Sequence, residues 1–292
     1  MEGSNPKATM LRAASAGRPI ENGDSTTGKL TPFLKWAGGK RWFVEKRATL
    51  LPAKFDRYLE PFLGGGAVFF HMTPRAGILS DKNPELIEAY QTVRDSWEAV
   101  FAELLVHDKK HSKTYYYSIR DRKFRSSIRR AARFIYLNRT CWNGLYRVNL
   151  RGAFNVPIGT KTKVVLPTDD FAAIASLLRP MTLAVADYKE TIAVAKKGDF
   201  LFIDPPYVTK RHSGAFIKYN EKLFSWSDQI ALRDCLVAAK NRKAMIVATN
   251  ADNKVIRRLY ENDFNIATAS RASVISGDAA SRGRRSELII ST

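Results

Sequence analysis

The chain has 292 residues, of which 45% are hydrophobic, so it can bury a sizeable core as one large domain or a domain with an insertion. Its formal charge of +20 indicates a polyanionic partner or an acidic surface. Two cysteines, Cys141 and Cys235, exclude a disulfide framework and favour a reducing, cytoplasmic compartment, and no apolar run approaches the roughly 18 residues of a membrane span.

The N-terminal part of the chain is predicted to be a disordered tail followed by alternating strands and helices. Residues 1–30 are rich in Gly, Ser, Thr, Asn and Ala without a sustained period. From there on, the pattern predicts a strand at 57–62, a glycine turn at 64–66, a helix from 67, a strand at 76–81 and a helix at 84–97 with Asn83 as its N-cap.

The C-terminal half continues the alternation. The pattern predicts a strand at 200–203, a helix at 227–240, a strand at 244–248 and two last strands at 264–267 and 286–291. Strands that alternate with helices are typical of a mostly parallel α/β sheet, which binds ligands at the carboxyl ends of its strands.

The glycine turn at 64–66 follows a strand and opens a helix, as in nucleotide- and nucleoside-binding units. Asp81, seventeen residues after Gly64, can bond the hydroxyls of a ribose. The sequence lacks the spaced glycines of a dinucleotide site and the Gly-Lys-Ser/Thr of a phosphate cradle, and Glu60 disfavours a pyrophosphate. These features favour S-adenosylmethionine, which carries a ribose and a positive centre. The alternative is a packing turn with a helix-capping acid.

A strand-like run, Phe200-Leu201-Phe202-Ile203, leads into Asp204-Pro205-Pro206-Tyr207. Two prolines lack amide donors, so the chain must leave the sheet here with its carbonyls free. The carboxylate of Asp204 and the carbonyl of Pro205 can accept the N–H groups of an exocyclic amino group while Tyr207 stacks on the base. An ordinary turn after a buried strand is the alternative.

A basic segment separates these two motifs. The stretch from His107 to Lys163 contains fifteen Lys or Arg residues and only two acids, Asp108 and Asp121, so its net charge is +13. Basic residues interleaved with aromatics are what phosphate contact and base stacking require, although a solvated charged face is the alternative. The aromatics are Tyr115, Tyr116, Tyr117, Phe124, Phe134, Tyr136, Trp142, Tyr146 and Phe154.

Four segments in this order resemble the Dam-type DNA adenine-N6 methyltransferases, the D12 class of group alpha. They are Leu-Lys-Trp-Ala-Gly-Gly-Lys at 34–40, Glu-Pro-Phe-Leu-Gly-Gly-Gly at 60–66, the basic insert, and Asp-Pro-Pro-Tyr at 204–207. The resemblance covers nearly all of the chain after Thr31. Within the insert it includes the segments 136–139, 143–147, 149–152 and 154–157.

The resemblance implies a Rossmann-like class I methyltransferase sheet with an inserted, mainly helical target-recognition domain. Residues 31–83 and 166–292 would form the catalytic domain, and residues 84–165 the recognition domain. The implied cofactor-binding residues are Trp36, Lys40, Glu60, Pro61, Phe62, Gly64, Asp81, Asp187, Tyr188 and Asp204. The implied DNA-binding residues are Arg139, Asn143, Leu145, Arg147, Asn149 and Arg151, and the catalytic ones are Asp204, Pro205, Pro206 and Tyr207.

The expected reaction is direct transfer of a methyl group from S-adenosylmethionine to N6 of an adenine flipped out of duplex DNA. Arg147 matches a family arginine that reads guanine, so the expected site is GATC or a related short site, although Trp142 and Thr160-Lys161 depart from the best-known relatives. No metal site is expected, since the four histidines (His71, His107, His111 and His212) lack a ligand set, and no obligate protein partner is indicated.

Two other classes of function stay open. One is a methyltransferase acting on another amino group: cytosine N4, a base in RNA, or a protein glutamine. Asp at position 204 and the basic insert favour DNA adenine instead. The other is a DNA-binding module without activity, which the intact cofactor motifs disfavour.

Overall fold

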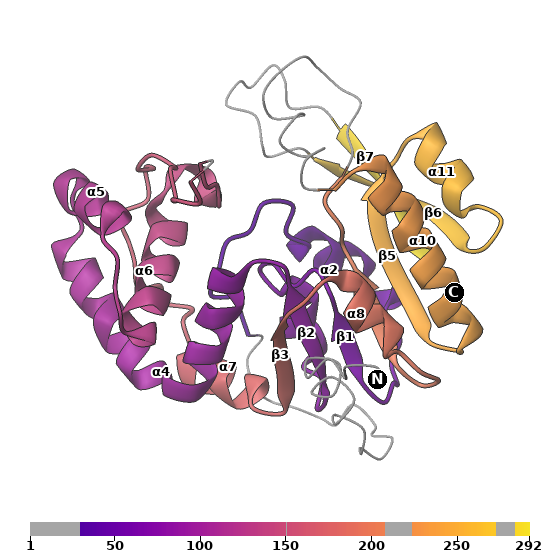
Figure 1. Cartoon of the computed structure of the whole chain (residues 1–292), viewed down its shortest axis with the longest axis horizontal. Coiled ribbons are helices and arrows are strands. Elements are labelled where there is room, and N and C mark those ends of the chain that lie inside the picture. The colour runs from indigo at the N-terminus through magenta and orange to yellow at the C-terminus, as the bar shows by residue number, and fades with distance from the viewer. Residues whose placement is uncertain (1–29, 150, 208–223, 273–283) are drawn as a thin grey trace, which may run out of the picture. The chain divides into compact units, whose positions relative to one another are not determined.

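The computed structural model describes residues 30–149, 151–207, 224–272 and 284–292 (Figure 1). The predicted tail at 1–30 lies almost entirely outside these residues, as does His212. In the part of the chain that is described, no helix combines the length and the apolar character needed to cross a membrane.

The strands of the described residues form one seven-stranded mixed sheet in the order β3-β2-β1-β4-β5-β7-β6. The pairs β2–β3, β1–β4 and β4–β5 are parallel, whereas β7 runs antiparallel to β5 and to β6. The strands are β1 (Tyr58–Glu60), β2 (Gly77–Asp81), β3 (Met181–Val185), β4 (Phe200–Ile203), β5 (Met245–Ala251), β6 (Asn265–Ala272) and β7 (Arg284–Ser291). The prediction of a mostly parallel α/β sheet is confirmed, and β3 is a strand that the sequence analysis did not predict.

Contacts divide the chain into two compact units. Among the described residues, the first unit contains 47–62 and the C-terminal part from Ala186 to Thr292, and the second contains 30–46 and the stretch from Leu63 to Val185.

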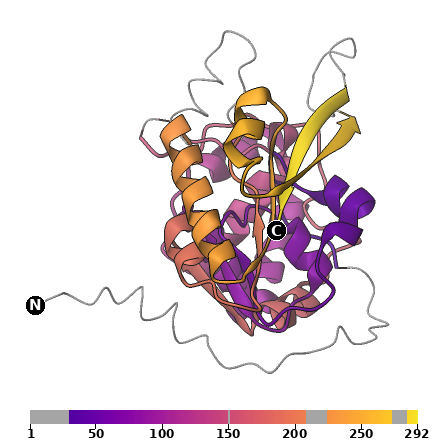
Figure 2. The ribbon, with the colours of Figure 1, turned by 90° about the vertical axis from the view of Figure 1, so that its right-hand side faces the viewer.

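The first unit is built on β1, β4, β5, β6 and β7, with the helices α8 (Tyr188–Ala193), α10 (Trp226–Asn241) and α11 (Lys254–Tyr260) and a 3-10 turn, η1 (Ala48–Leu50). All four residues of β4 are buried, as expected for a parallel strand covered on both faces. Ser225 and Asp228 form a capping box at the start of α10, which packs on α8 and β5. Figure 2 shows the antiparallel β6–β7 pair in yellow, with α10 in orange.

The second unit contains β2, β3 and a group of helices. The helices are α2 (Arg41–Arg47), α3 (Ala67–Met72), α4 (Pro84–Lys110), α5 (Lys113–Asp121), α6 (Ser127–Thr140), η2 (Trp142–Gly144, a 3-10 turn) and α7 (Phe171–Leu178). Helix α4 packs along α6 and also against α7, and α5 packs against α6 (Figure 1). The insert is therefore helical as far as Thr140, and beyond η2 the described residues up to Val165 form no helix or strand.

Helix α4 confirms its predicted start and corrects its predicted end. The side chain of Asn83 accepts the N–H groups of Glu85 and Leu86, as an N-cap does. The helix continues past the predicted end at residue 97 to Lys110, and only Ser96 departs from helical angles, with φ −153° and ψ 44°. The buried Val100 and Leu104 continue its apolar face beyond this kink, which explains why the chain resumes the helix.

Four of the nine aromatic residues of the basic segment belong to the core. Tyr116, Phe134, Tyr136 and Phe154 are buried inside the second unit. The interpretation that these rings stack on bases is therefore wrong for these four residues, because their side chains are already covered by protein. Trp142, at 48% exposure, is an exposed ring of this segment.

Candidate active site

In the second unit, the glycine turn is tied to the acid at the end of β2. The backbone N–H of Gly64 donates to Oδ2 of Asp81 at 3.1 Å, and that of Asn83 donates to Oδ1 at 3.0 Å. The hydroxyl of Tyr90 donates to the carbonyl of Gly64 at 3.2 Å. Burial raises the pKa of Asp81, and the N–H donors partly offset this effect. The carboxylate is thus held in place with further lone pairs available to hydroxyl donors.

Trp36 lies directly on this turn. Gly64 has a left-handed φ of +47°, and a Cβ atom there would lie 2.7 Å from Cδ1 of Trp36. Only glycine fits both constraints. Lys40 is 3% exposed and its Nζ donates to the carbonyl of Gly38 at 2.9 Å. The structure therefore brings Trp36, Gly64 and Asp81 together as the sequence predicted.

Helix α6 holds the segment that precedes Trp36. Oδ1 of Asn138 accepts the N–H of Lys35 at 2.8 Å, and its Nδ2 donates to the carbonyl of Lys35 at 2.7 Å. Arg139 is 8% exposed, donates to the carbonyl of Phe33 and forms an ion pair with Asp169 at 2.6 Å. In this conformation the guanidinium of Arg139 faces protein, which disagrees with its predicted contact to DNA.

Of the other predicted DNA-binding residues, four are exposed around a short hairpin, namely Asn143, Arg147, Asn149 and Arg151, while Leu145 is half-buried. An antiparallel bridge joins Val148 to Phe154. Arg147 is oriented by Asn155, whose Oδ1 accepts its Nε–H at 2.8 Å. Oδ1 of Asn149 accepts the N–H groups of Arg151 and Ala153, so this side chain forms the turn.

In the first unit, Asp204 follows β4 beside the neighbouring strand β5. Ile203 pairs with Ala248, and the next residue, Thr249, donates its Oγ1 hydroxyl to Oδ1 of Asp204 at 2.8 Å. The hydroxyl of Tyr207 donates to Oε2 of Glu287 at 2.7 Å. Desolvation and the nearby carboxylates of Asp204 and Glu287 raise the pKa of Tyr207 well above its usual value.

A buried amide pair supports the same tetrapeptide. Nε2 of Gln229 donates to the carbonyl of Pro206 at 3.4 Å, and Nδ2 of Asn250 donates to Oε1 of Gln229 at 2.9 Å. Thr249, Asn250, Gln229 and Glu287 were not predicted as site residues. The sequence held a signal for three of them, because Thr249 and Asn250 are polar residues that follow the apolar part of β5, and Glu287 directly precedes the apolar part of β7.

Of the remaining predicted cofactor residues of the first unit, Glu60, Pro61 and Tyr188 are buried and Phe62 and Asp187 are half-buried. Glu60 is 3% exposed and accepts the hydroxyl of Tyr58 at 2.9 Å. Phe62, next to the buried Pro61, stacks on Tyr188 with ring centroids 5.4 Å apart. Asp187 is the N-cap of α8.

The residues around Asp81 fit S-adenosylmethionine. The glycine turn packs on the ring of Trp36 and does not form a phosphate-binding loop, and Asp81 offers acceptor atoms suited to ribose hydroxyls. Together, the mixed seven-stranded sheet and this site define a class I methyltransferase fold.

Comparison with known proteins identifies the family. Residues 36–275 match the model of the D12 class N6 adenine-specific DNA methyltransferase. The chain is 35% identical over 270 residues to the type II methyltransferase M1.LlaDCHI of Lactococcus lactis subsp. cremoris, covering 89% of this chain and 95% of that protein. It is 34% identical over 264 residues to the DNA adenine methylase of Serratia marcescens (88% and 96% covered) and 31% identical over 261 residues to that of Escherichia coli K12 (88% and 93% covered). The chain belongs to the D12 class of N6 adenine-specific DNA methyltransferases, enzymes that use S-adenosylmethionine.

Proposed function

We propose that this enzyme methylates adenine within GATC, or a closely related short duplex site, after flipping the base out of the helix. The observation that supports the site is the exposed Arg147, whose Nε is fixed by Asn155 at the base of the hairpin. Arginine is suited to bond O6 and N7 of a guanine together. We place the enzyme with the DNA in the cytoplasm.

For the chemistry, we assign Asp204 and the carbonyl of Pro205 as acceptors for the N–H groups of the adenine amino group, with Tyr207 stacking on the base. S-adenosylmethionine supplies an electrophilic methyl group when it is bound. Thr249 fixes one oxygen of Asp204, and Glu287 fixes the ring of Tyr207. Positioning and electrostatics then carry the catalysis, without a covalent enzyme intermediate. Cys141 is buried and burial raises the pKa of its thiol to about 11, which suits a packing role.

For S-adenosylmethionine, we assign Asp81 to the ribose, and Trp36 and Lys40 as contacts from the N-terminal turn. We assign Glu60, Pro61 and Phe62 to the methionine part of the cofactor, and Asp187 and Tyr188 to its adenine ring. The buried position of Glu60 and the Phe62–Tyr188 stack support this assignment.

For DNA recognition, we assign residues 84–165, with contacts from Asn143, Leu145, Arg147, Asn149 and Arg151. Arg139 is assigned a structural role instead. Among the described residues of the basic segment, arginines that form ion pairs with acids of the protein itself include Arg120, Arg129, Arg130 and Arg139, and of these pairs the one between Arg139 and Asp169 is buried. Exposed basic residues that remain for phosphates include Lys109, Lys110, Lys113, Arg122, Lys123, Arg125, Lys161 and Lys163.

The test is single-molecule sequencing of plasmid DNA methylated by the wild-type enzyme and by Arg147→Ala. We expect N6-methyladenine in GATC from the wild type, and a loss of roughly 1–3 kcal/mol of discrimination at one guanine in the variant, by the usual worth of a bidentate base contact. Arg125→Ala removes an exposed arginine that has no assigned base and is the matched control. If the wild type modifies no GATC, the assignment of GATC as the target fails. If Arg147→Ala methylates the same motif as the wild type, Arg147 does not read the guanine.

A further inference from the structure

Within the second unit, the residues just before the proposed DNA-reading Arg147 contact the segment 33–40, which contains the proposed cofactor residues Trp36 and Lys40. The ring of Tyr146 stacks on that of Trp36, with centroids 5.6 Å apart and planes 21° apart. A Cβ atom on Gly144 would lie 2.6 Å from Cδ of Lys35, so the turn before Tyr146 packs closely on the residue before Trp36. Gly144 and Tyr146 therefore contact the consecutive residues Lys35 and Trp36.

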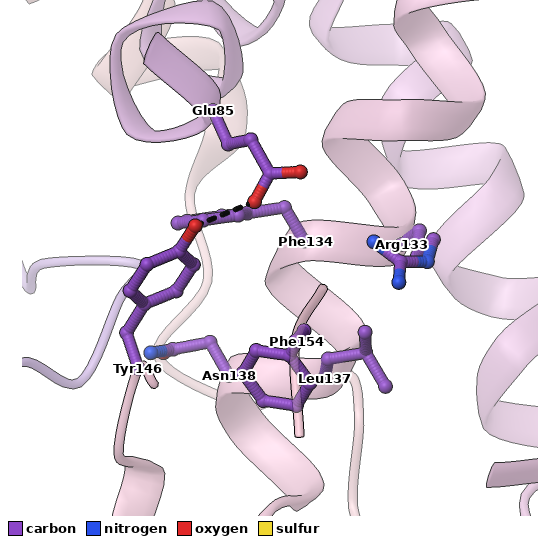
Figure 3. A pocket seen from close by; sticks show the side chains of 7 residues that line it. All are labelled: Glu85, Arg133, Phe134, Leu137, Asn138, Tyr146 and Phe154. Atoms are coloured by element: carbon purple, nitrogen blue, oxygen red, sulfur yellow. Dashed lines mark hydrogen bonds between the residues drawn. The ribbon is translucent and has the colours of Figure 1, made fainter. Parts of the chain in front are cut away.

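Tyr146 is held on its other side by the start of α4. Its hydroxyl donates to Oε2 of Glu85 at 2.7 Å, as Figure 3 shows. Glu85 lies four residues after Asp81, on the first turn of the helix that Asn83 caps. Tyr146 thus bridges the Trp36 segment and the first turn of α4, the helix that follows β2.

The ring of Tyr146 also borders a small cavity in this unit. Its other lining residues are the apolar Phe134, Leu137 and Phe154 and the polar Glu85, Arg133 and Asn138 (Figure 3). Asn138 is the residue that holds Lys35 by two hydrogen bonds. The Tyr146 ring contacts the rings of Phe134 and Phe154 as well as that of Trp36, and Trp36 in turn packs closely on Gly64.

We propose that Tyr146 is a positioning residue through which DNA binding tightens the hold on S-adenosylmethionine. Immobilising the hairpin at Arg147, the next residue, fixes the Tyr146 ring, which in turn fixes Trp36 against Gly64. The inference rests on the proposed roles of Trp36 in cofactor binding and of Arg147 in DNA binding. Coupling of this kind is reciprocal, so the cofactor tightens binding of the specific duplex by the same factor.

The experiment measures by calorimetry the dissociation constant of S-adenosylhomocysteine, the demethylated form of the cofactor, which has no methyl group to transfer, with and without a duplex that contains one GATC. In the wild type we expect the duplex to tighten cofactor binding at least about fivefold, the low end of typical coupling between sites. Tyr146→Leu removes the stack, and the ratio should fall to about one while the melting temperature and the affinity for non-specific duplex are retained. Tyr146→Phe keeps the ring and should retain most of the ratio.

Tyr117→Leu is the matched control, because Tyr117 is a half-buried tyrosine of α5 that contacts Arg120 instead. It should keep the wild-type ratio. The proposal is overturned if the wild type shows no coupling, if Tyr146→Leu keeps it, or if Tyr146→Phe is as impaired as Tyr146→Leu. Trp36→Leu separates the two levels of inference: if it leaves cofactor affinity unchanged, the cofactor assignment itself fails, and if it weakens binding while Tyr146→Leu does not, only the coupling fails.

Discussion

The bond between Thr249 and Asp204 predicts that a single buried hydroxyl controls turnover. Thr249 is fully buried on β5, and its hydroxyl bonds the carboxylate of Asp204 at 2.8 Å. Thr249→Val keeps the shape of the side chain and removes this donor. A hydrogen bond to a charged group contributes roughly 1.5–3 kcal/mol, which corresponds to a fall in kcat of about 10- to 150-fold if the bond orients Asp204 in the transition state.

The assay is transfer of labelled methyl groups to a duplex under saturating cofactor and DNA, with KM measured for each. We expect kcat to fall, both KM values to change little, and Thr249→Ser to recover most of the activity because it restores the hydroxyl. A melting temperature close to that of the wild type would exclude general unfolding. If Thr249→Val turned over within twofold of the wild type, the hydroxyl would not position Asp204.

Three further outcomes follow from the described residues. Asp169→Ala leaves the charge of Arg139 buried and unpaired, so denaturant unfolding should show a loss of about 3–5 kcal/mol. Burial lowers the pKa of His107 from 6.5 to about 4. The free energy of unfolding should therefore be at its full value above pH 6.5 and should fall by up to about 3 kcal/mol as the pH falls toward 4 and below. His107→Phe should lack this part of the pH dependence in thermal unfolding. Replacing Lys161 and Lys163 by Ala should reduce the slope of log affinity against log salt by about 1.8 if each contacts a phosphate, and an unchanged slope would remove both from the interface.

The sequence predicted those strands whose apolar runs are continuous. Phe200–Ile203 and Met245–Ala251 are buried along nearly their whole length, so their composition alone marks them. Met181–Val185 was not predicted because buried residues alternate with partly exposed ones along it, so it forms no continuous apolar run. The end of α4 was misplaced because Ser96 interrupts the helix locally, and only packing against α6 carries the helix past it.

Contacts within the candidate site could be predicted where the two residues lie close in the sequence. Gly64 and Asp81 meet because the glycine turn and the end of the next strand are only 17 residues apart. Glu287 lies 80 residues from Tyr207, and Thr249 lies 45 residues from Asp204, so only the strand register brings them together. Arg139 shows the converse error, since a basic residue in a basic segment was assigned to DNA although a distant acid, Asp169, binds it.

The hydrogen bonds from α6 to the backbone of residues 33–35 limit which part of the recognition region can be exchanged between enzymes of different specificity. The side-chain amide of Asn138 exchanges two hydrogen bonds with the backbone of Lys35, as one residue does with its partner across an antiparallel ladder. A graft that replaced the entire insert would remove this partner and release the Trp36 segment. The transferable cassette therefore begins after Thr140 and ends by Val165, so a chimera that keeps α4 to α6 and replaces residues 141–165 keeps the two hydrogen bonds between Asn138 and Lys35.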